Sequence, residues 1–376
     1  MGTRYTQPGK ECMNIPFVDI KRNQEPLKKE IFAAIEHIVD KTQYILGPAV
    51  EHFEKAFADY CGKKYCVGVS NGTAALELAL RAYDIHSGDE VITAANTFFS
   101  GASVINLVGA TPVFVDVEEN SNNLDPKKLA TAITNKTKAI IVTHLYGRPA
   151  NMEAVLALGK KHNIVIIEDC AQAHGATYQG KKVPYGETGC FSFYPGKNLG
   201  SWGDGGAVVT NNKIIAERIT SLRNFGGSFK AYQHNEIAGN NRLQPLQAAV
   251  LAIKLKHLDT WIQERRKKAA YYTKHLKGIV KTPEDTEGHA YHIYCIETEQ
   301  RDALQTYLET QGIQIRIHYP TPIPYQPAYA YLHTKKGTYP ITEVKSGNIM
   351  GIPLFPEITQ EEQDYIIMHI KKFLKK

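Results

Sequence analysis

The chain has no apolar run long enough to cross a bilayer, and its polar start, residues 1–10, lacks the pattern of a signal peptide. Its 376 residues are too many for one small core and are enough for two domains. We therefore do not expect a membrane-spanning or secreted protein. Instead, we expect a soluble cytoplasmic protein.

Cysteine is scarce for a chain of this length. The cysteines fit neither a dense disulfide framework nor a Cys-x2-Cys zinc motif, and they are Cys12, Cys61, Cys66, Cys170, Cys190 and Cys295. We interpret them as reduced thiols and expect no metal site. Cys170 adjoins an aspartate, but a small buried residue explains it better than a nucleophile does.

Signals for nucleic-acid binding and for the common nucleotide loops are missing. The net charge is +6, yet the lysines are scattered and form no basic stripe with interleaved aromatics. Neither G-x-G-x-x-G nor the P-loop pattern occurs, and the glycine-rich cluster at 203–206 does not open a helix. We therefore expect small-molecule ligands and no nucleic-acid partner.

Strand-like runs alternate with helical ones between about residues 65 and 209, as the βα units of a mainly parallel sheet require. The clearest strands are Tyr65–Ser70, Glu90–Ala94, Thr111–Val117, Ala139–Val142, Ile164–Ile167 and Ala207–Thr210. Residues 247–277 have helical spacing and lead toward the C-terminus. The sequence predicts an α/β fold with a large domain at 14–250 and a smaller C-terminal α/β domain at 251–376.

One aspartate and one lysine stand out in this arrangement. Asp169 follows a β-branched strand, at the carboxyl end where open parallel sheets bind ligands. Lys197 lies between Pro195-Gly196 and the glycine-rich cluster at 203–206. Such glycines are typical of a loop in which the backbone closely approaches another group. Pyridoxal phosphate (PLP) needs a lysine amine to hold its aldehyde as a Schiff base and a carboxylate to keep its pyridine nitrogen protonated. The pair therefore suggests a PLP enzyme, although a turn aspartate and a surface lysine are plainer alternatives.

A phosphate-bearing cofactor also needs an anion site. Asn71-Gly72 predict a turn, and the Ala/Leu-rich stretch after Thr73 predicts a helix whose N-terminal amides face that turn. We therefore expect Gly72, Thr73 and Ala74 to bind the phosphate. An ordinary N-cap would have the same pattern.

Ordered motifs along almost the whole chain resemble those of the DegT/DnrJ/EryC1/StrS family, sugar aminotransferases that use PLP. The matching segments are 53–57, 70–74, 88–92, 144–147, 168–175, 191–206, 246–249 and 318–320. The resemblance implies the PLP-dependent transferase fold type I, the fold of aspartate aminotransferase. Members in which histidine replaces the lysine are dehydratases, so Lys197 favours transamination.

The resemblance also implies residue roles. Lys197 matches the Schiff-base lysine, Asp169 the partner of the pyridine nitrogen, and Gln172 the residue beside the ring hydroxyl. Ser192 matches a serine that joins Thr73 and Ala74 at the phosphate. Phe98 matches an aromatic that stacks on the cofactor ring, although by itself it would be interpreted as core.

Asn240 matches an asparagine that reaches the phosphate of the neighbouring subunit's cofactor. The implied assembly is a homodimer with shared active sites.

For the substrate, the motifs look most like members that aminate carbon 3 of a dTDP- or UDP-linked 3-keto sugar, with L-glutamate as the amino donor. His318 and Tyr319 are the expected sugar contacts, although ordinary strand residues would fit as well. Two alternatives stay open. One is amination of carbon 4 of a 4-keto sugar nucleotide, and the other is a PLP-binding sensor without turnover.

Overall fold

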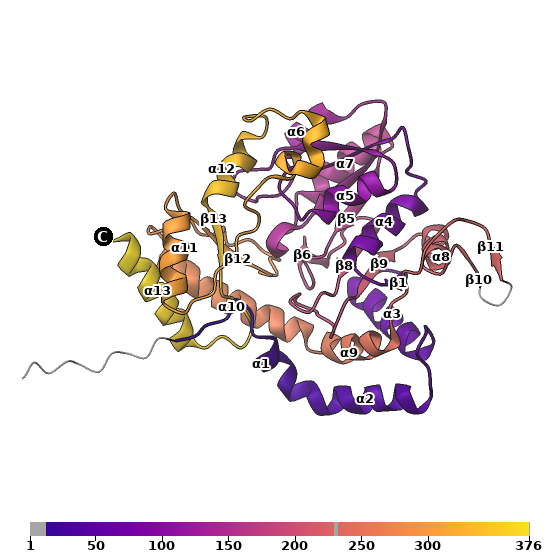
Figure 1. The fold of residues 1–376 in the computed structure, drawn as a ribbon, viewed down its shortest axis with the longest axis horizontal. Helices are drawn as coiled ribbons and strands as arrows, with labels where there is room; N and C mark the ends of the chain where they lie inside the picture. The colour runs from indigo at the N-terminus through magenta and orange to yellow at the C-terminus, as the bar shows by residue number, and fades with distance from the viewer. Residues whose placement is uncertain (1–12, 229–231, 376) are drawn as a thin grey trace, which may run out of the picture.

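A seven-stranded sheet forms the centre of the protein, in the order β1-β9-β8-β5-β4-β2-β3 (Figure 1). The computed structural model describes residues 13–228 and 232–375. The strands of the sheet are β1 (Tyr65–Val69), β2 (Glu90–Ala94), β3 (Thr111–Val115), β4 (Thr137–Thr143), β5 (Val165–Asp169), β8 (Thr188–Ser192) and β9 (Gly206–Thr210). Strands β3, β2, β4, β5 and β8 are parallel to one another, and β9 is antiparallel to both β1 and β8. The sheet is thus mainly parallel, as predicted.

Helices cover both faces of this sheet. One face packs against α4 (Gly72–Ala82), α5 (Ser100–Leu107) and α8 (Lys213–Leu222). The other packs against α3 (Pro48–Cys61), α6 (Pro126–Ala132), α7 (Met152–His162) and α9 (Pro245–Leu255). In β9, Val208 enters the first core while Ala207 and Val209 enter the second, because successive strand side chains point to opposite faces.

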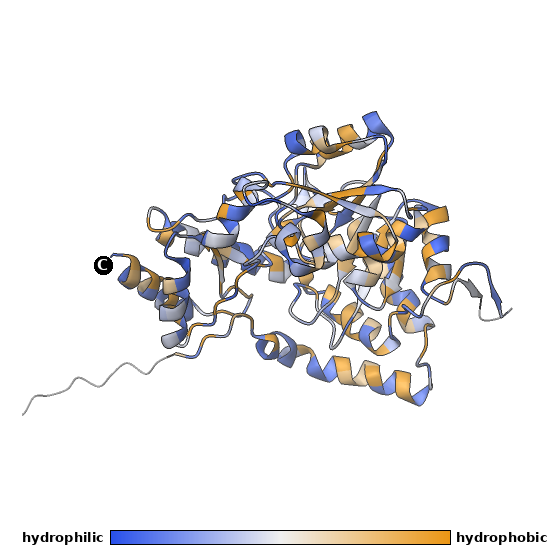
Figure 2. Cartoon of the chain, turned by 45° about the horizontal axis from the view of Figure 1, so that its top comes forward, coloured by the Kyte–Doolittle hydropathy of each residue, from blue (hydrophilic) through white to orange (hydrophobic). Residues whose placement is uncertain are grey.

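The N-terminal helices lie along the outside of this assembly. They are α1 (Ile20–Gln24), the 3-10 turn η1 (Glu25–Leu27) and α2 (Lys28–Asp40), which packs on α9. Figure 2 shows several apolar residues along α2. Phe32 and Val39 are 52% and 47% exposed, so this helix is only partly covered within one chain.

The smaller domain lies at one end of the molecule in Figure 1. It contains β12 (Tyr294–Glu297), β13 (Ile349–Ile352), α10 (Leu258–Leu276), α11 (Arg301–Thr310) and α13 (Gln360–Leu374). The helix α13 begins with a capping box, in which Thr359 Oγ1 accepts from the Glu362 amide and Glu362 accepts from the Thr359 amide. The core of this domain also includes Ile15 from the N-terminal segment.

Part of the C-terminal half returns to the large domain. This part comprises η3 (Ile323–Tyr325), η4 (Pro327–Leu332) and α12 (Pro340–Asn348). The buried Asp116 accepts hydrogen bonds from the amides of Ile341 and Thr342, at 3.0 and 2.8 Å. It also forms an ion pair with Lys128. Burial opposes the charge, but these bonds outweigh it and lower the pKa of Asp116. The returning segment is therefore tied to the sheet by a charged buried group.

Two small hairpins complete the described structure, β6 (Thr177–Tyr178) with β7 (Lys181–Lys182) and β10 (Gly227–Ser228) with β11 (Gln233–His234). The second projects from the end of the molecule opposite the smaller domain (Figure 1). The described cysteines, Cys61, Cys66, Cys170, Cys190 and Cys295, are buried and free, while Cys12 lies outside the described residues. None of the helices in the described ranges combines the length and apolar character needed to span a bilayer.

Three details differ from the sequence expectations. The helical region expected at 247–277 is two helices, α9 and α10, which are separated at Lys256-His257. The expected domain boundary at 250/251 falls inside α9, whereas the cores divide within α10, since Ile262 packs in the large domain and Ala269 in the small one. The strand β8, just before the lysine loop, was not among the expected strands.

Candidate active site

Asp169 is the last residue of β5 and is buried at the carboxyl end of the parallel strands. Its Oδ1 accepts from the Ala171 amide at 3.0 Å, and its Oδ2 accepts from Thr143 Oγ1 at 3.3 Å. Burial is the largest influence and raises the pKa of Asp169, although these bonds and the charge of Lys197 oppose the rise. A positively charged group bound beside Asp169 would therefore stabilise its ionised form.

Lys197 lies in a tight loop between β8 and β9. The Lys197 amide donates to the Tyr194 carbonyl at 2.8 Å. A Cβ on Gly200 would lie 2.3 Å from the Pro195 carbonyl oxygen, so the loop closes only with glycine at that position. Burial lowers the pKa of Lys197 to about 8, against the opposing charge of Asp169. The amine is therefore much easier to deprotonate than a surface lysine.

The strand register explains how other polar groups reach Asp169. Thr143 ends β4 directly opposite Asp169 in the parallel pairing, and its hydroxyl also lies 2.9 Å from Thr97 Oγ1. Phe98, the residue after Thr97, is 52% exposed, and its ring centroid lies 6.0 Å from that of Tyr319. An aromatic that is half exposed at this edge can stack on a planar ring, so the core alternative for Phe98 is wrong.

The expected phosphate residues meet where α4 begins. Gly72 is the first residue of α4, and a Cβ there would lie 2.6 Å from Ser192 Cβ. Glycine therefore allows the end of β8 to contact the helix N-terminus. Gly206 has a matching role, because a Cβ there would lie 2.4 Å from the Asn71 carbonyl. The glycine-rich cluster after Lys197 thus marks the close backbone approach that the sequence predicted.

The ordinary N-cap is also present at this turn. Asn71 Oδ1 accepts from the Ala74 amide at 2.8 Å, so a phosphate at that amide would compete with the asparagine. The amides of Gly72 and Thr73 belong to the first turn of α4, where backbone donors have no partner within the helix. The helix N-terminus, Thr73 and Ser192 together offer an anion several donors.

Gln172 and the predicted sugar contacts are joined by hydrogen bonds. Gln172 Nε2 donates to Tyr319 Oη at 3.2 Å, and Gln172 Oε1 accepts from the Tyr146 amide at 2.8 Å. His318 stacks on Phe17 with ring centroids 5.9 Å apart. The structure therefore brings the expected ring-hydroxyl residue and the expected sugar residues together.

Three imidazoles, those of His174, His292 and His318, lie close enough to Lys197 for its charge to lower their pKa values, and burial has the larger effect on each. Burial, and then the charge of Lys197, lower the pKa of His174 to about 3 and that of His318 to about 4. Both rings are therefore neutral near pH 7 and add no positive charge beside the lysine.

Asn240 is exposed. It pairs with Asn224 in an isolated bridge, and the next residue, Asn241, accepts from the Ser70 amide at 2.9 Å. The segment carrying Asn240 therefore runs beside the turn that leads into α4. Its contact with a partner's cofactor stays a prediction.

One group of potential metal ligands occurs in the described residues, His144, Glu168 and Cys170. Glu168 already accepts from His144 Nε2 at 2.8 Å and from the amides of Tyr185 and Gly186. Burial also raises the pKa of the Cys170 thiol well above its usual value. These groups satisfy one another and hold the strand end that carries Asp169.

A family model, the DegT/DnrJ/EryC1/StrS aminotransferase family, matches residues 25–371 of the chain. The protein belongs to this family of aminotransferases. A "Pleiotropic regulatory protein" of Geobacillus stearothermophilus is 42% identical, with 96% of this chain and 99% of that protein covered. The dTDP-3-amino-3,6-dideoxy-alpha-D-galactopyranose transaminase of Aneurinibacillus thermoaerophilus is 44% identical, with the same coverage of both.

Solved structures agree with this assignment. DesV of S. venezuelae, in complex with a ketimine intermediate, superposes with a TM-score of 0.94 at 40% identity and covers 96% of this chain and 99% of that one. The protein ntda from Bacillus subtilis, with bound cofactor PMP, has a TM-score of 0.90 at 29% identity, with 98% and 87% covered. The predictions of fold type I and of PLP as the cofactor are confirmed.

The residues present fit that cofactor. Asp169 is a buried carboxyl that a pyridinium would stabilise, Lys197 is a buried amine, and the start of α4 offers donors to a phosphate. Thr143 and Tyr146 were not recognised as contributors from the sequence. Thr143 could have been identified from the sequence, because it aligns with Asp169 at the ends of adjacent parallel strands.

We expect Lys197 of the cofactor-free protein to titrate near pH 8, because burial lowers the pKa to about 8. Above that pH the amine is neutral and reactive, and below it the amine is protonated. Competitive reductive methylation across a pH series, followed by mass spectrometry of the peptide with Lys197, measures the midpoint. Lys213, with 70% of its side chain exposed, is the internal reference for the reaction.

The Asp169→Asn variant supplies the control for this titration. It removes a negative charge that favours the cation, so the midpoint of Lys197 should move further down while Lys213 stays fixed. A Lys197 midpoint equal to that of Lys213 would contradict the account of the site.

Proposed function

We propose that the protein transfers an amino group from L-glutamate to carbon 3 of a dTDP- or UDP-linked 3-keto sugar. The observation that carries the proposal is the meeting of Lys197 and Asp169 with the start of α4 at one edge of the sheet. The name of the Aneurinibacillus relative, a 3-amino sugar transaminase, supports carbon 3.

The chemistry divides between cofactor and protein. When bound, PLP takes up the amino group and withdraws electrons from the carbon that loses a proton. Asp169 supplies the negative charge that holds the pyridine nitrogen protonated. Lys197 Nζ accepts and returns the proton, and its lowered pKa of about 8 leaves a useful neutral fraction near neutral pH.

The neighbours of Lys197 suit this role. His174 and His318 are neutral near pH 7, so neither repels a proton arriving at Nζ. His318 and Tyr319 lie next to Gln172 and Phe98, where a sugar lying against the cofactor would be held. We assign these two residues to the sugar and Gln172 to the ring hydroxyl.

We also propose that the enzyme works in the cytoplasm as a homodimer with shared sites. The exposed position of Asn240, next to the residue that accepts from the Ser70 amide, supports a contact across a subunit boundary. The partly exposed apolar residues of α2 add a second surface that a subunit could cover.

Purified enzyme should release 2-oxoglutarate from L-glutamate in a sustained manner only when a 3-keto sugar nucleotide is added. A panel of 3-keto and 4-keto sugar nucleotides with dTDP and UDP, read by coupled assay of 2-oxoglutarate, identifies the acceptor. Lys197→Ala should lose nearly all turnover, whereas the exposed control Lys160→Ala should keep it. Preference for a 4-keto acceptor would replace the carbon 3 proposal, and PLP binding without turnover on any acceptor would favour the sensor.

Asn240→Ala should weaken PLP retention about ten- to a hundredfold, because an amide-to-phosphate hydrogen bond contributes about 1.5–3 kcal/mol. Asn235→Ala, at an exposed asparagine directly after β11, is the matched control and should bind PLP normally. Absorbance titration of the cofactor-free protein measures both.

Mixing Asn240→Ala with Lys197→Ala then tests the shared sites. A hybrid dimer with shared sites has one site with both defects and one with neither, so activity should return at limiting PLP. If subunit exchange is verified and no activity returns, each chain completes its own site.

A further inference from the structure

Tyr146 has an unusual backbone for an aromatic residue. It lies in the short turn η2 (Leu145–Gly147) directly after β4, with φ of 59°, and its side chain is buried. Left-handed φ values are uncommon for residues other than glycine and collect at functional sites. The chain is closely packed at the next residue, because a Cβ on Gly147 would lie 3.0 Å from backbone atoms of both Gln172 and His292.

Hydrogen bonds from Tyr146 reach both halves of the candidate site. Its amide donates to Gln172 Oε1 at 2.8 Å, and its phenol donates to the carbonyl oxygen of His318. Gln172 Nε2 in turn donates to Tyr319 Oη at 3.2 Å. Because His318 and Tyr319 are adjacent in the chain, these three bonds close a cycle.

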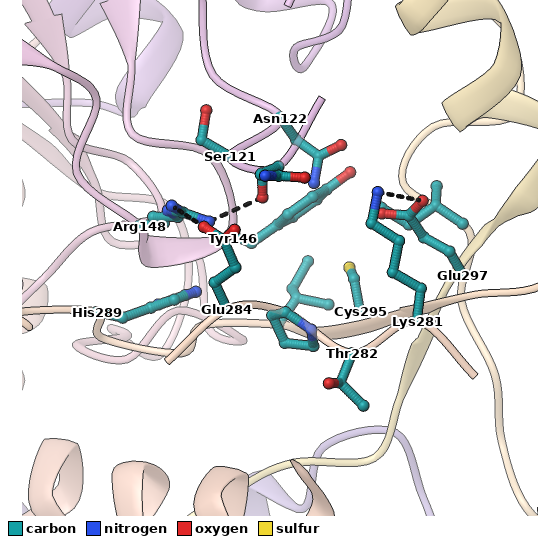
Figure 3. Close-up of a pocket in the computed structure, with 14 residues that line it drawn as sticks. Ser121, Asn122, Tyr146, Arg148, Lys281, Thr282, Glu284, His289, Cys295 and Glu297 are labelled. Atoms are coloured by element: carbon teal, nitrogen blue, oxygen red, sulfur yellow. Dashed lines mark hydrogen bonds and ion pairs between the residues drawn. The ribbon is translucent and has the colours of Figure 1, made fainter. Parts of the chain in front are cut away.

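The ring of Tyr146 is fixed by packing between the two domains. It belongs to a buried cluster with Leu145, Ile293, Cys295 and Ile349, and Tyr319 packs against the same cluster. Figure 3 shows the ring between Asn122 on one side and Cys295 on the other, at the wall of a pocket of about 30 Å³. The phenol is therefore positioned by residues of both domains.

We propose that Tyr146 is a positioning residue, which holds Gln172, His318 and Tyr319 in fixed positions relative to one another. The proposal rests on the proposed function, which places the cofactor ring at Gln172 and the sugar at His318 and Tyr319. Tyr146 Oη fixes the backbone that carries the sugar contacts, and its amide fixes the side chain at the ring hydroxyl. The distance between acceptor sugar and cofactor ring is then set by a group that touches neither.

Tyr146→Phe removes the bond to the His318 carbonyl and keeps the ring. We expect a roughly tenfold rise in the KM for the keto-sugar with a smaller change in kcat, because the sugar contacts lose their anchor while Lys197 and Asp169 are untouched. In the protein without substrate, amide hydrogen exchange of the peptide at 316–321 should become faster. Tyr325→Phe is the matched control, since its phenol bonds Glu343 and Lys335 in the same C-terminal half but outside the cycle.

A double-mutant cycle separates positioning from simple packing. Tyr146→Phe and Tyr319→Phe each open the same ring of bonds, so we expect the double variant to bind PLP no more than about twofold worse than the weaker single variant. When Tyr146→Phe is combined with Tyr325→Phe, the two changes in PLP affinity should multiply, because the two residues act independently. If Tyr146→Phe unfolds, hydrogen exchange at 316–321 in Tyr319→Phe replaces it as the test of the cycle.

Multiplicative losses for Tyr146 and Tyr319, or unchanged exchange at 316–321, would overturn the proposal. PLP affinity and hydrogen exchange need no sugar, so they remain decisive even if the enzyme acts on another acceptor. Failure of the proposed function would instead appear as absent turnover in the wild-type enzyme.

Discussion

The burial of one carboxyl and one amine at the same edge of the sheet is the constraint on which the account depends. Removal from water raises the pKa of Asp169 and lowers that of Lys197, so each group alone is driven toward its neutral form. Each also favours the charge of the other. With a cationic pyridine ring bound there, Asp169 would have a partner for its charge and Lys197 would be free to be neutral. The roles that we propose for the two side chains thus follow from where the fold places them.

The fold brings these groups together through backbone contacts that few residues allow. Parallel strands β4 and β5 end side by side and present Thr143 next to Asp169. Gly72 and Gly206 then let β8, β9 and the start of α4 approach closely, which places the anion site next to the lysine loop. The C-terminal half returns to this edge and adds His318 and Tyr319. The site therefore depends on both domains.

Much of this could be predicted from the sequence, because β-branched runs and glycine clusters have local causes. The strands around Asp169 and the close approach at Gly206 are examples. The domain division could not be located, since Ile15 joins the small core from far away in the chain and α10 contributes to both cores. The capping of Ala74 by Asn71 was an open alternative, and the structure contains it. The role of Tyr146 depends on a left-handed backbone and on long-range bonds, for which one sequence has no local signal.

The identity of the lysine joined to the cofactor tests the central claim most directly. Borohydride reduction of the PLP-loaded enzyme, followed by peptide mass spectrometry, fixes the pyridoxyl group on the residue that bound it. The account predicts a pyridoxyl group on Lys197 alone. The informative competitor is Lys254, a second buried lysine whose pKa burial also lowers to about 8, but whose amine donates to the Gly200 carbonyl. A pyridoxyl group on Lys254, or on no lysine, would contradict the account.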